Sequence, residues 1–483
     1  MRQSSDDRAL YYRQLRDTIR HVFLPELTSL QAIDAAGLVD RILAEFIVEE
    51  EAAAALSAEF GGDFEAVLSP GAGIERGVVT PARFHELRAR AAEVVARTVG
   101  SADAGERELG RRLVEIERRF LERVDELRSA VLADGSSNGH EQPTNECSVT
   151  KEQITGYLRR RLTNSPEVVA ERLSVVPGGR SKETVLVSLS GTVELPHEVI
   201  LRKDRPVSVL ASRAADEFAV IKAVHTFGGV PIPEPFFAEG DGHGLGDGTF
   251  LIMERVAGTK AGEFFPDLAA PEQFRQEIGL QLATSLARLH SLPLDQLGDT
   301  SLDAPPPAVT EDSVIATVEA IMARINELTG PPCATVPLAH QWLLEHVGDV
   351  VPAPRLCLLQ GDFGFHNMLV DGTRVTALVD WEGAAVGPPA RELAAAWSAA
   401  TTLMSWPAFV EAYLHAGGSV EDTDPRAISY YRVLGSLGGY MASRTGGHLF
   451  RTGAKRDLVT AHSGLDSQFR CQRNLARALG DAM

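Results

Sequence analysis

The feature that most constrains the fold is a change of hydrophobic pattern across a polar segment. Before residue 133, apolar residues recur every three or four positions, as in amphipathic helices. Beyond residue 150, β-branched runs appear instead, such as TVLVSL at 184–189. The segment between them, ADGSSNGHEQPTNE, is polar and rich in turn-forming residues. We therefore expect an all-α helical domain at 1–132, a flexible linker at 133–150 and an α+β region after it.

The helical domain shows a regular apolar stripe but no catalytic constellation. Apparent breaks at Gly61-Gly62 and at Ser69-Pro70-Gly71 predict a bundle of four or five helices. The clearest stripe lies within 106–132 and consists of Leu109, Leu113, Ile116, Phe120, Val124, Leu127 and Val131. Such a bundle could be a packed structural appendage, a homodimerisation surface, a substrate lid or a docking module. The polar linker predicts that the rest of the chain folds without residues 1–145.

Composition argues against several classes of protein. Of the 483 residues 44% are apolar, and no run of about 18 apolar residues could span a membrane. A net charge of −19 disfavours nucleic acid and anionic membranes as partners. The first residues, MRQSSDDRALYYRQ, lack the order of a secretory signal, which predicts a cytoplasmic location. The four cysteines form no C-x-x-C pair, so neither a zinc site nor a disulfide framework is expected.

The densest chemical signal is LQGDFGFHNMLV at 359–370, followed by VTALVDWE at 375–382. An Asp-Gly turn between two strand-like runs predicts a hairpin that brings Asn367 and Asp380 to the same end. Phosphoryl transfer requires one carboxylate that orients the acceptor hydroxyl, and an amide and a second carboxylate that hold Mg²⁺ against the nucleotide phosphates. Together with Asp362, these residues supply the required groups.

A glycine turn upstream could bind the nucleotide. In VPGGRS at 176–181, Gly178, Gly179 and Ser181 precede a strand-like run. Glycines in such a turn let backbone N–H groups approach phosphates closely. A Pro-Gly-Gly turn alone is also common in ordinary hairpins, so its weight comes from the elements that follow it.

Two cations and a helical acid follow the turn. Arg202 and Lys203 end a strand-like run, where a cation could pair with phosphates. Glu217 lies on the next predicted helix and could fix that cation. The order of glycine turn, cation, helical glutamate, apolar strand and catalytic loop favours a nucleotide site.

These motifs together resemble the aminoglycoside phosphotransferase family, which has a protein-kinase-like fold. The family pattern is roughly H-G-D-x-x-x-x-N, then a strand and D-W-E, and it is matched by Gly361-Asp362, Asn367 and Asp380-Trp381-Glu382. The segment GPPARELA at 387–394 is similar to the family's G-D-P-x-x-D-L-A. The resemblance covers about residues 150–480.

Two departures from the family pattern concern supporting residues. Gln360 stands where the family commonly has histidine, and Pro388 stands where the first aspartate of the later segment usually lies. We expect the hydrogen bonds that support the loop to differ while the reacting groups persist.

The resemblance implies a bilobal fold, with a β-rich N-lobe at 151–258 and a mostly helical C-lobe at 259–483. It implies that Asp362 is the catalytic base and that Asn367 and Asp380 are magnesium ligands. It also implies that Arg202 takes the place of the kinase strand lysine, with Lys203 as the rival assignment.

The run FLIM at 250–253 resembles the hinge between kinase lobes, whose backbone binds the adenine edge. Met253, Glu254 and Val256 are the candidates there, although Met253 would suit a core position equally well. The cofactors implied are ATP, or GTP in its place, and Mg²⁺.

The sequence thus predicts a kinase with a small-molecule hydroxyl acceptor. Within the family, antibiotic kinases act on aminoglycosides or macrolides, whereas relatives resembling domains fused to some acyl-CoA dehydrogenases act on hydroxyacyl groups. The LRK and GGRS segments look closer to the second group. Residues 345–483 hold 12 basic against 14 acidic residues, which disfavours a polycationic acceptor. The alternative is a catalytically silent, nucleotide-binding regulatory or scaffold protein with a kinase fold, favoured only by Gln360 and Pro388.

Overall fold

The chain packs into two compact units in a computed structural model. The structure describes residues 5–27, 30–69, 79–133, 147–176, 182–204, 213–240, 245–246, 248–261, 271–298, 300, 302, 309–328, 330, 333–455 and 458–483. The helical unit comprises residues 1–143, 309–352 and 429–483, and the sheet unit comprises residues 144–308 and 353–428. The helical unit therefore includes more of the chain than the domain expected at 1–132. The boundaries expected at 150 and 258 stay predictions, and most of the linker lies outside the described residues.

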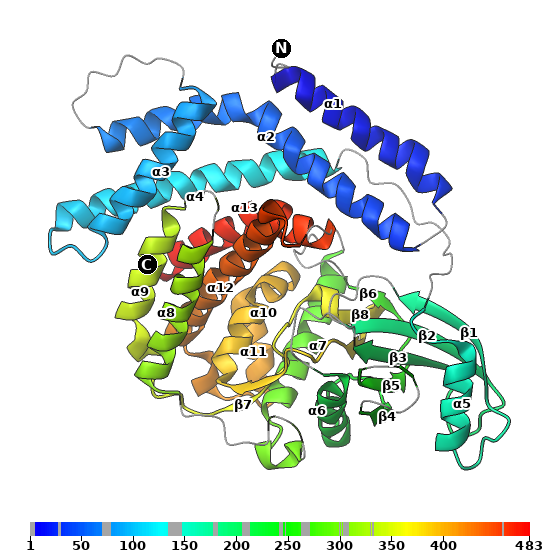
Figure 1. Ribbon diagram of the computed structural model, residues 1–483. Helices are drawn as coiled ribbons and strands as arrows, with labels where there is room; N and C mark the ends of the chain where they lie inside the picture. Colours follow the sequence, from blue (N-terminus) through cyan, green and yellow to red (C-terminus); the bar gives the residue numbers. More distant parts are fainter. Residues whose placement is uncertain are drawn as a thin grey trace. The chain divides into compact units, whose positions relative to one another are not determined.

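The regular elements in the described part of the helical unit are all helices (Figure 1). Its elements are α1 (Ser5–Thr18), η1 (Ile19–Phe23), η2 (Leu24–Glu26), α2 (Leu30–Leu68), α3 (Pro81–Thr98), α4 (Ala104–Ala133), α8 (Glu311–Glu327), α9 (Thr335–Glu345), η4 (Val347–Asp349), most of α12 (Pro425–Thr452) and α13 (Leu458–Ala482).

Helix α2 runs unbroken through Gly61 and Gly62, so the break expected there is wrong. The reason is close packing, because a Cβ atom added at Gly61 would lie 2.6 Å from the Cβ atom of Val79. Glycine costs about 1 kcal/mol relative to alanine inside a helix. Here it lets the buried segment just before α3 approach α2. Helix α2 ends at Leu68, next to the second expected break, whose residues 70 and 71 lie outside the described part.

The predicted stripe of α4 faces the core of the helical unit, which confirms the helical periodicity. Phe60, Phe84 and Phe120 from three helices form edge-to-face contacts at its centre, with ring centroids 5.3 and 5.9 Å apart. Ala334, just before α9, and Ala476 of α13 belong to the same cluster. Residues distant in sequence thus complete the core of the N-terminal helices.

The sheet unit is built on a five-stranded antiparallel sheet of order β1-β2-β3-β5-β4. The strands are β1 (Val169–Val176), β2 (Lys182–Ser190), β3 (Glu198–Asp204), β4 (Pro235–Glu239) and β5 (Phe250–Glu254). One face is apolar, because alternate residues such as Val185, Val187 and Leu201 lie in a buried cluster with α5 (Lys151–Arg161). The opposite face carries the side chains that matter for the site.

Two small sheets and several helices complete this unit. The sheets have the orders β6-β8-β9 and β10-β7. Their strands are β6 (Thr259–Lys260), β7 (Cys357–Leu359), β8 (Met368–Asp371), β9 (Arg374–Leu378) and β10 (Ala385–Gly387). The helices are α6 (Ala214–Phe227), α7 (Glu272–His290), η3 (Leu294–Leu297), η5 (Phe365–Asn367), α10 (Pro389–Leu403), α11 (Trp406–His415) and η6 (Val420–Thr423).

The expected hairpin is present. Strands β8 and β9 pair antiparallel, with Met368 opposite Leu378, and Gly372 adopts a positive φ of 58° in the turn. The N–H of Val379 donates to the carbonyl of Asn367 at 2.9 Å. The loop residues before β8 and after β9 are therefore held together, which confirms that Asn367 and Asp380 share one end of the hairpin.

Within the described residues, no helix combines the length and the apolar character needed to cross a bilayer. None of the four cysteines forms a disulfide, and Cys333 and Cys357 are buried.

Candidate functional site

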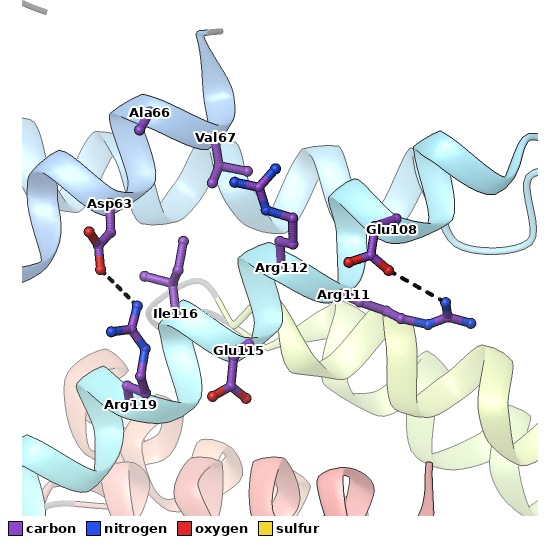
Figure 2. A pocket seen from close by; sticks show the side chains of 9 residues that line it. All are labelled: Asp63, Ala66, Val67, Glu108, Arg111, Arg112, Glu115, Ile116 and Arg119. Atoms are coloured by element: carbon purple, nitrogen blue, oxygen red, sulfur yellow. Dashed lines mark hydrogen bonds and ion pairs between the residues drawn. The ribbon is translucent and has the colours of Figure 1, made fainter.

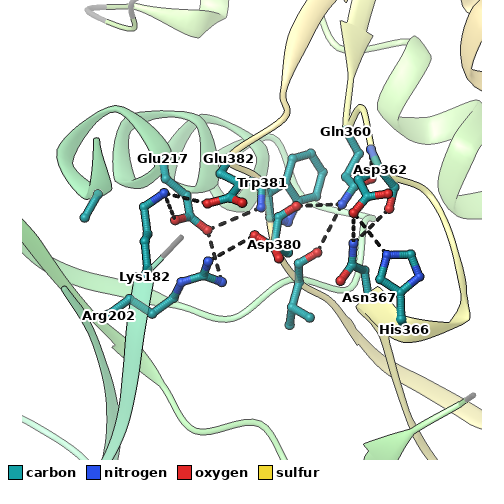
Figure 3. A network of polar contacts seen from close by, with 12 residues as sticks. Lys182, Arg202, Glu217, Gln360, Asp362, His366, Asn367, Asp380, Trp381 and Glu382 are labelled. Carbon is teal, nitrogen blue, oxygen red and sulfur yellow. Dashed lines mark hydrogen bonds and ion pairs between the residues drawn. The ribbon is translucent and has the colours of Figure 1, made fainter. Parts of the chain in front are cut away.

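Strand β3 sends its two cations to opposite faces of the large sheet, because successive side chains alternate. Arg202 lies 3.3 Å from the carboxylate of Glu217 and 3.0 Å from that of Asp380 (Figure 3). Lys203 lies opposite Phe250, whose side chain is part of the apolar cluster on the other face. Of the two rival cations, Arg202 is therefore the one that meets the predicted metal ligand.

Glu217 of α6 sits at the centre of this polar network and is fully buried. Besides Arg202, it accepts a hydrogen bond from the backbone N–H of Trp381 at 3.3 Å and lies 3.7 Å from the ammonium of Lys182. Burial raises the pKa of Glu217, and the two cations act in the opposite direction. Burial opposes the charge of Arg202, but the carboxylates of Glu217 and Asp380 outweigh it and raise the pKa of the guanidinium.

The loop before β8 presents Asp362. The amide nitrogen of Asn367 donates to both the backbone oxygen and the carboxylate of Asp362, each at 2.9 Å. His366 Nε2 lies 3.0 Å from the same carboxylate, whose side chain is half exposed. The carboxylate is thus fixed in direction and still open to an incoming substrate.

Gln360 and Glu392 supply the hydrogen bonds that support this loop. The Gln360 amide donates to the carbonyls of Val379 at 3.1 Å and Asp380 at 2.7 Å, and its oxygen accepts from the N–H of Asp362 at 2.8 Å. The buried carboxylate of Glu392 accepts the backbone N–H groups of Gln360 and Gly361 at 2.6 and 2.9 Å. Gln360 therefore links the catalytic loop to the segment of Asp380 despite the departure from the family pattern.

The backbone around these residues adopts uncommon conformations. Gly361 has a φ of 89°, and a Cβ atom there would lie 2.0 Å from the carbonyl oxygen of Gly383. Asp380, with a φ of 63°, is the one non-glycine residue of the described chain with a positive φ. Such strain persists only where the surroundings over-determine it, and it is typical of functional sites.

The two residues expected to bind Mg²⁺ lie at the same end of the β8–β9 hairpin. Asn367 uses its amide nitrogen for Asp362, so its amide oxygen stays available, and Asp380 offers the carboxylate oxygen that Arg202 does not contact. Mg²⁺ is commonly held by one or two carboxylates and by substrate phosphates. Among the described residues, no group of three or more His, Cys, Asp or Glu side chains is placed to hold a metal ion. The residues present therefore fit a magnesium ion shared with a nucleotide.

The other residues predicted to contact the nucleotide lie at the end of β5 and in the segment before β2. Met253 is buried on the face of the sheet that also carries Arg202. The N–H of Glu254 already donates to the carbonyl of Glu234 at 2.8 Å, whereas Val256 lies just beyond the end of β5. Their adenine contacts stay predictions. Gly178, Gly179 and Ser181 lie outside the described residues.

Lys182 is the site residue that the sequence analysis missed. It is 1% exposed, and its ammonium lies 2.8 Å from the carboxylate of Glu382. A signal was present, because the alternation of buried Val185 and Val187 places Lys182 on the other face of β2. The strand register that places Lys182 beside Arg202, however, cannot be predicted from the local sequence.

A hollow of about 600 Å³ lies in the helical unit, between α2 and α4 (Figure 2). Two of the three arginines that line it are paired, since Arg119 lies 2.7 Å from Asp63 and Arg111 lies 3.7 Å from Glu108. The described residues of this lining do not include the motif residues that the sequence analysis singled out. The candidate site is the polar network of the sheet unit.

A five-stranded sheet with an arginine–glutamate pair, facing a loop with Asp362 and Asn367, defines a phosphotransferase with a protein-kinase-like fold, as predicted from the sequence. Residues 172–431 match the model of the phosphotransferase enzyme family (APH). This match covers more than half of the 483 residues, and the chain belongs to that family.

The chain is also similar to curated relatives and, in fold, to a solved structure. Acyl-CoA dehydrogenase family member 11 of Rattus norvegicus is 30% identical over 204 residues, which are 40% of this chain and 24% of the relative. The Gallus gallus protein of the same name is 28% identical over 266 residues, 52% of this chain and 30% of the relative. The chain thus spans less than a third of these relatives. A Ralstonia eutropha structure proposed to be an aminoglycoside phosphotransferase has a TM-score of 0.53 at 14% identity, covering 69% of this chain and 99% of that chain, and supports the fold alone.

Proposed function

We propose that the protein is an ATP- and Mg²⁺-dependent kinase that phosphorylates a hydroxyl group of a small molecule. The observation that carries this proposal is the convergence of Asp362, Asn367 and Asp380 at one end of the β8–β9 hairpin, with Arg202 3.0 Å from Asp380. Membership of the phosphotransferase family supports the same reaction class.

The residues divide the chemistry between them. Asp362 accepts a hydrogen bond from the acceptor hydroxyl and takes up its proton as the phosphoryl group is transferred. Asn367 and His366 keep its carboxylate oriented. Asn367 and Asp380 hold Mg²⁺, which neutralises developing charge on the phosphates when it is bound. The guanidinium of Arg202, 3.3 Å from Glu217 and 3.0 Å from Asp380, keeps both carboxylates in place beside the phosphates.

The catalytically silent alternative loses its support in this arrangement. Gln360 and Pro388 were the features that favoured a scaffold role. Gln360 forms hydrogen bonds with Asp362 and with the carbonyl of Asp380. Glu392 accepts hydrogen bonds from the loop backbone, although Pro388 stands where the family usually has an aspartate. We therefore infer that these hydrogen bonds hold the loop in the conformation needed for phosphate transfer.

A hydroxyacyl compound is the acceptor that we favour over an aminoglycoside or a macrolide. The relatives named acyl-CoA dehydrogenase family member 11 support an acyl-CoA-related acceptor. The near balance of 12 basic and 14 acidic residues in 345–483 also disfavours a polycationic antibiotic.

The first test measures Mg²⁺-dependent consumption of ATP and of GTP with a panel of hydroxyacyl-CoAs, aminoglycosides, macrolides and simple hydroxylated metabolites. We expect turnover stimulated by a hydroxyacyl compound, abolished by EDTA and absent from an Asp362→Ala blank. Tight nucleotide binding without turnover stimulated by any compound would contradict the proposed kinase activity and support a nucleotide-binding scaffold protein instead. Stimulation by an aminoglycoside alone would overturn the acceptor class while keeping the kinase.

A second prediction follows because Arg202 and Lys203 lie on opposite faces of the sheet. Arg202→Met should lower kcat/KM for ATP by about 10²-fold or more, because it leaves the fully buried carboxylate of Glu217 and the carboxylate of Asp380 without their guanidinium partner. Lys203→Met should change kcat/KM much less, since its side chain lies on the other face. Steady-state kinetics at varied ATP, with thermal unfolding to confirm folding, measures both. Equal losses in the two variants would contradict the assignment of Arg202.

A further inference from the structure

Two buried cations, from two strands, share the carboxylate of Glu217 as a neighbour. Directly opposite residues of an antiparallel pair share a face, and so do residues two apart on one strand. Lys182 of β2 lies opposite Asp204, and Thr184 lies opposite Arg202. Lys182 and Arg202 are therefore diagonal neighbours on the face that meets Asp380 (Figure 3).

Arg202 and Lys182 differ in the number of carboxylates that each contacts closely. Arg202 spreads its two terminal nitrogens between Glu217 and Asp380, so its planar guanidinium is fixed by two carboxylates. Lys182 makes one close contact, at 2.8 Å with Glu382, and lies 3.7 Å from the second oxygen of Glu217. An ammonium has three donors on a flexible four-carbon stem. Lys182 can therefore keep Glu217 as a neighbour and turn a donor to a ligand.

The position of Lys182 favours an anionic ligand. It is the first residue of β2 and directly follows Gly178, Gly179 and Ser181 in the sequence, for which phosphate contacts are predicted. Taking a charged ammonium out of water is costly unless charged partners compensate it, and Glu382 and Glu217 supply that compensation before a ligand binds.

We propose that Lys182 is the phosphate-contacting cation of this kinase, supplied by β2, while Arg202 on β3 orients Glu217 and Asp380. This inference rests on the proposed function and deepens it. The ligand is the phosphate chain of the nucleotide, and Lys182 exchanges its contact with Glu382 for a phosphate oxygen when the nucleotide binds.

Binding of ATP and of adenosine, measured by calorimetry on the full-length chain with Mg²⁺, tests this proposal without relying on turnover. Adenosine carries no phosphate, so a phosphate contact affects ATP alone. Lys182→Met should weaken ATP binding about 10- to 100-fold, the loss expected for one charge-assisted hydrogen bond, and leave adenosine binding unchanged. Lys222→Met, which removes an exposed lysine of α6, is the matched control.

A double variant, Lys182→Met with Glu382→Gln, separates phosphate contact from charge compensation. It removes both partners of the buried pair and so avoids an unpaired carboxylate. We expect it to bind ATP as weakly as the single variant. Recovery of ATP affinity would overturn the proposal, because Lys182 would then only neutralise Glu382, and so would equal losses for ATP and adenosine. A wild type that binds neither compound would refute the proposed function itself, and the role of Lys182 with it.

Discussion

Replacement of Asp362 by asparagine should lower the rate of phosphate transfer about 10²- to 10⁴-fold, the contribution typical of a positioned general base. Asparagine keeps the size of the side chain but cannot accept the proton of the hydroxyl. The Arg202–Glu217 and Arg202–Asp380 pairs do not involve Asp362, so nucleotide affinity should persist. Single-turnover measurements of phosphate transfer, together with calorimetric titration of ATP, separate the two effects.

The matched control is Asp371→Asn, an exposed carboxylate at the turn of the same hairpin. It should transfer phosphate at the wild-type rate. A loss smaller than tenfold in Asp362→Asn would contradict the role of Asp362 as base and point to another acceptor of the hydroxyl proton.

Deletion of residues 1–143 should leave a chain that aggregates, which reverses the expectation from the polar linker. The N-terminal helices share one core with segments near the other end of the sequence, including Ala334 and Ala476. Glu117 of α4 accepts both the backbone N–H of Thr335 at 2.9 Å and its hydroxyl at 3.1 Å, so it caps the start of α9. Truncation would remove this cap and expose the apolar faces of α9 and α13. Light scattering and thermal unfolding of the truncated chain measure the effect.

Cleavage provides the control for that deletion. A protease site placed within residues 134–146 should yield two fragments that co-elute under native conditions, because α4 also pairs with α13 through Asp125–Arg473 and Glu122–Arg477. A monodisperse truncated chain with a cooperative unfolding transition would show instead that the later segments fold without their N-terminal partners.

Much of the catalytic loop could be predicted because its determinants are local. Asp362 and Asn367 lie five residues apart in one loop, and the Asp-Gly turn fixes the hairpin that returns the chain to Asp380. The stripe of α4 was equally readable, since helical periodicity depends only on near neighbours. In the N-terminal helices, the failure at Gly61 had a non-local cause, because that glycine serves the approach of Val79 and not a turn.

The sequence by itself indicated the candidate reaction groups and determined the hairpin that gathers them and the helical character of the N-terminal region. The tertiary structure alone decided that Arg202 and not Lys203 faces Asp380, that Lys182 joins it, and that Gln360 links the catalytic loop to the strand end. It also decided which helices share a core. The physical reason is the range of the interactions: turns and helical periods follow from neighbouring residues, whereas strand register, buried ion pairs and helix packing join separate elements, 20 positions apart for Gln360 and Asp380 and 178 apart for Arg202 and Asp380.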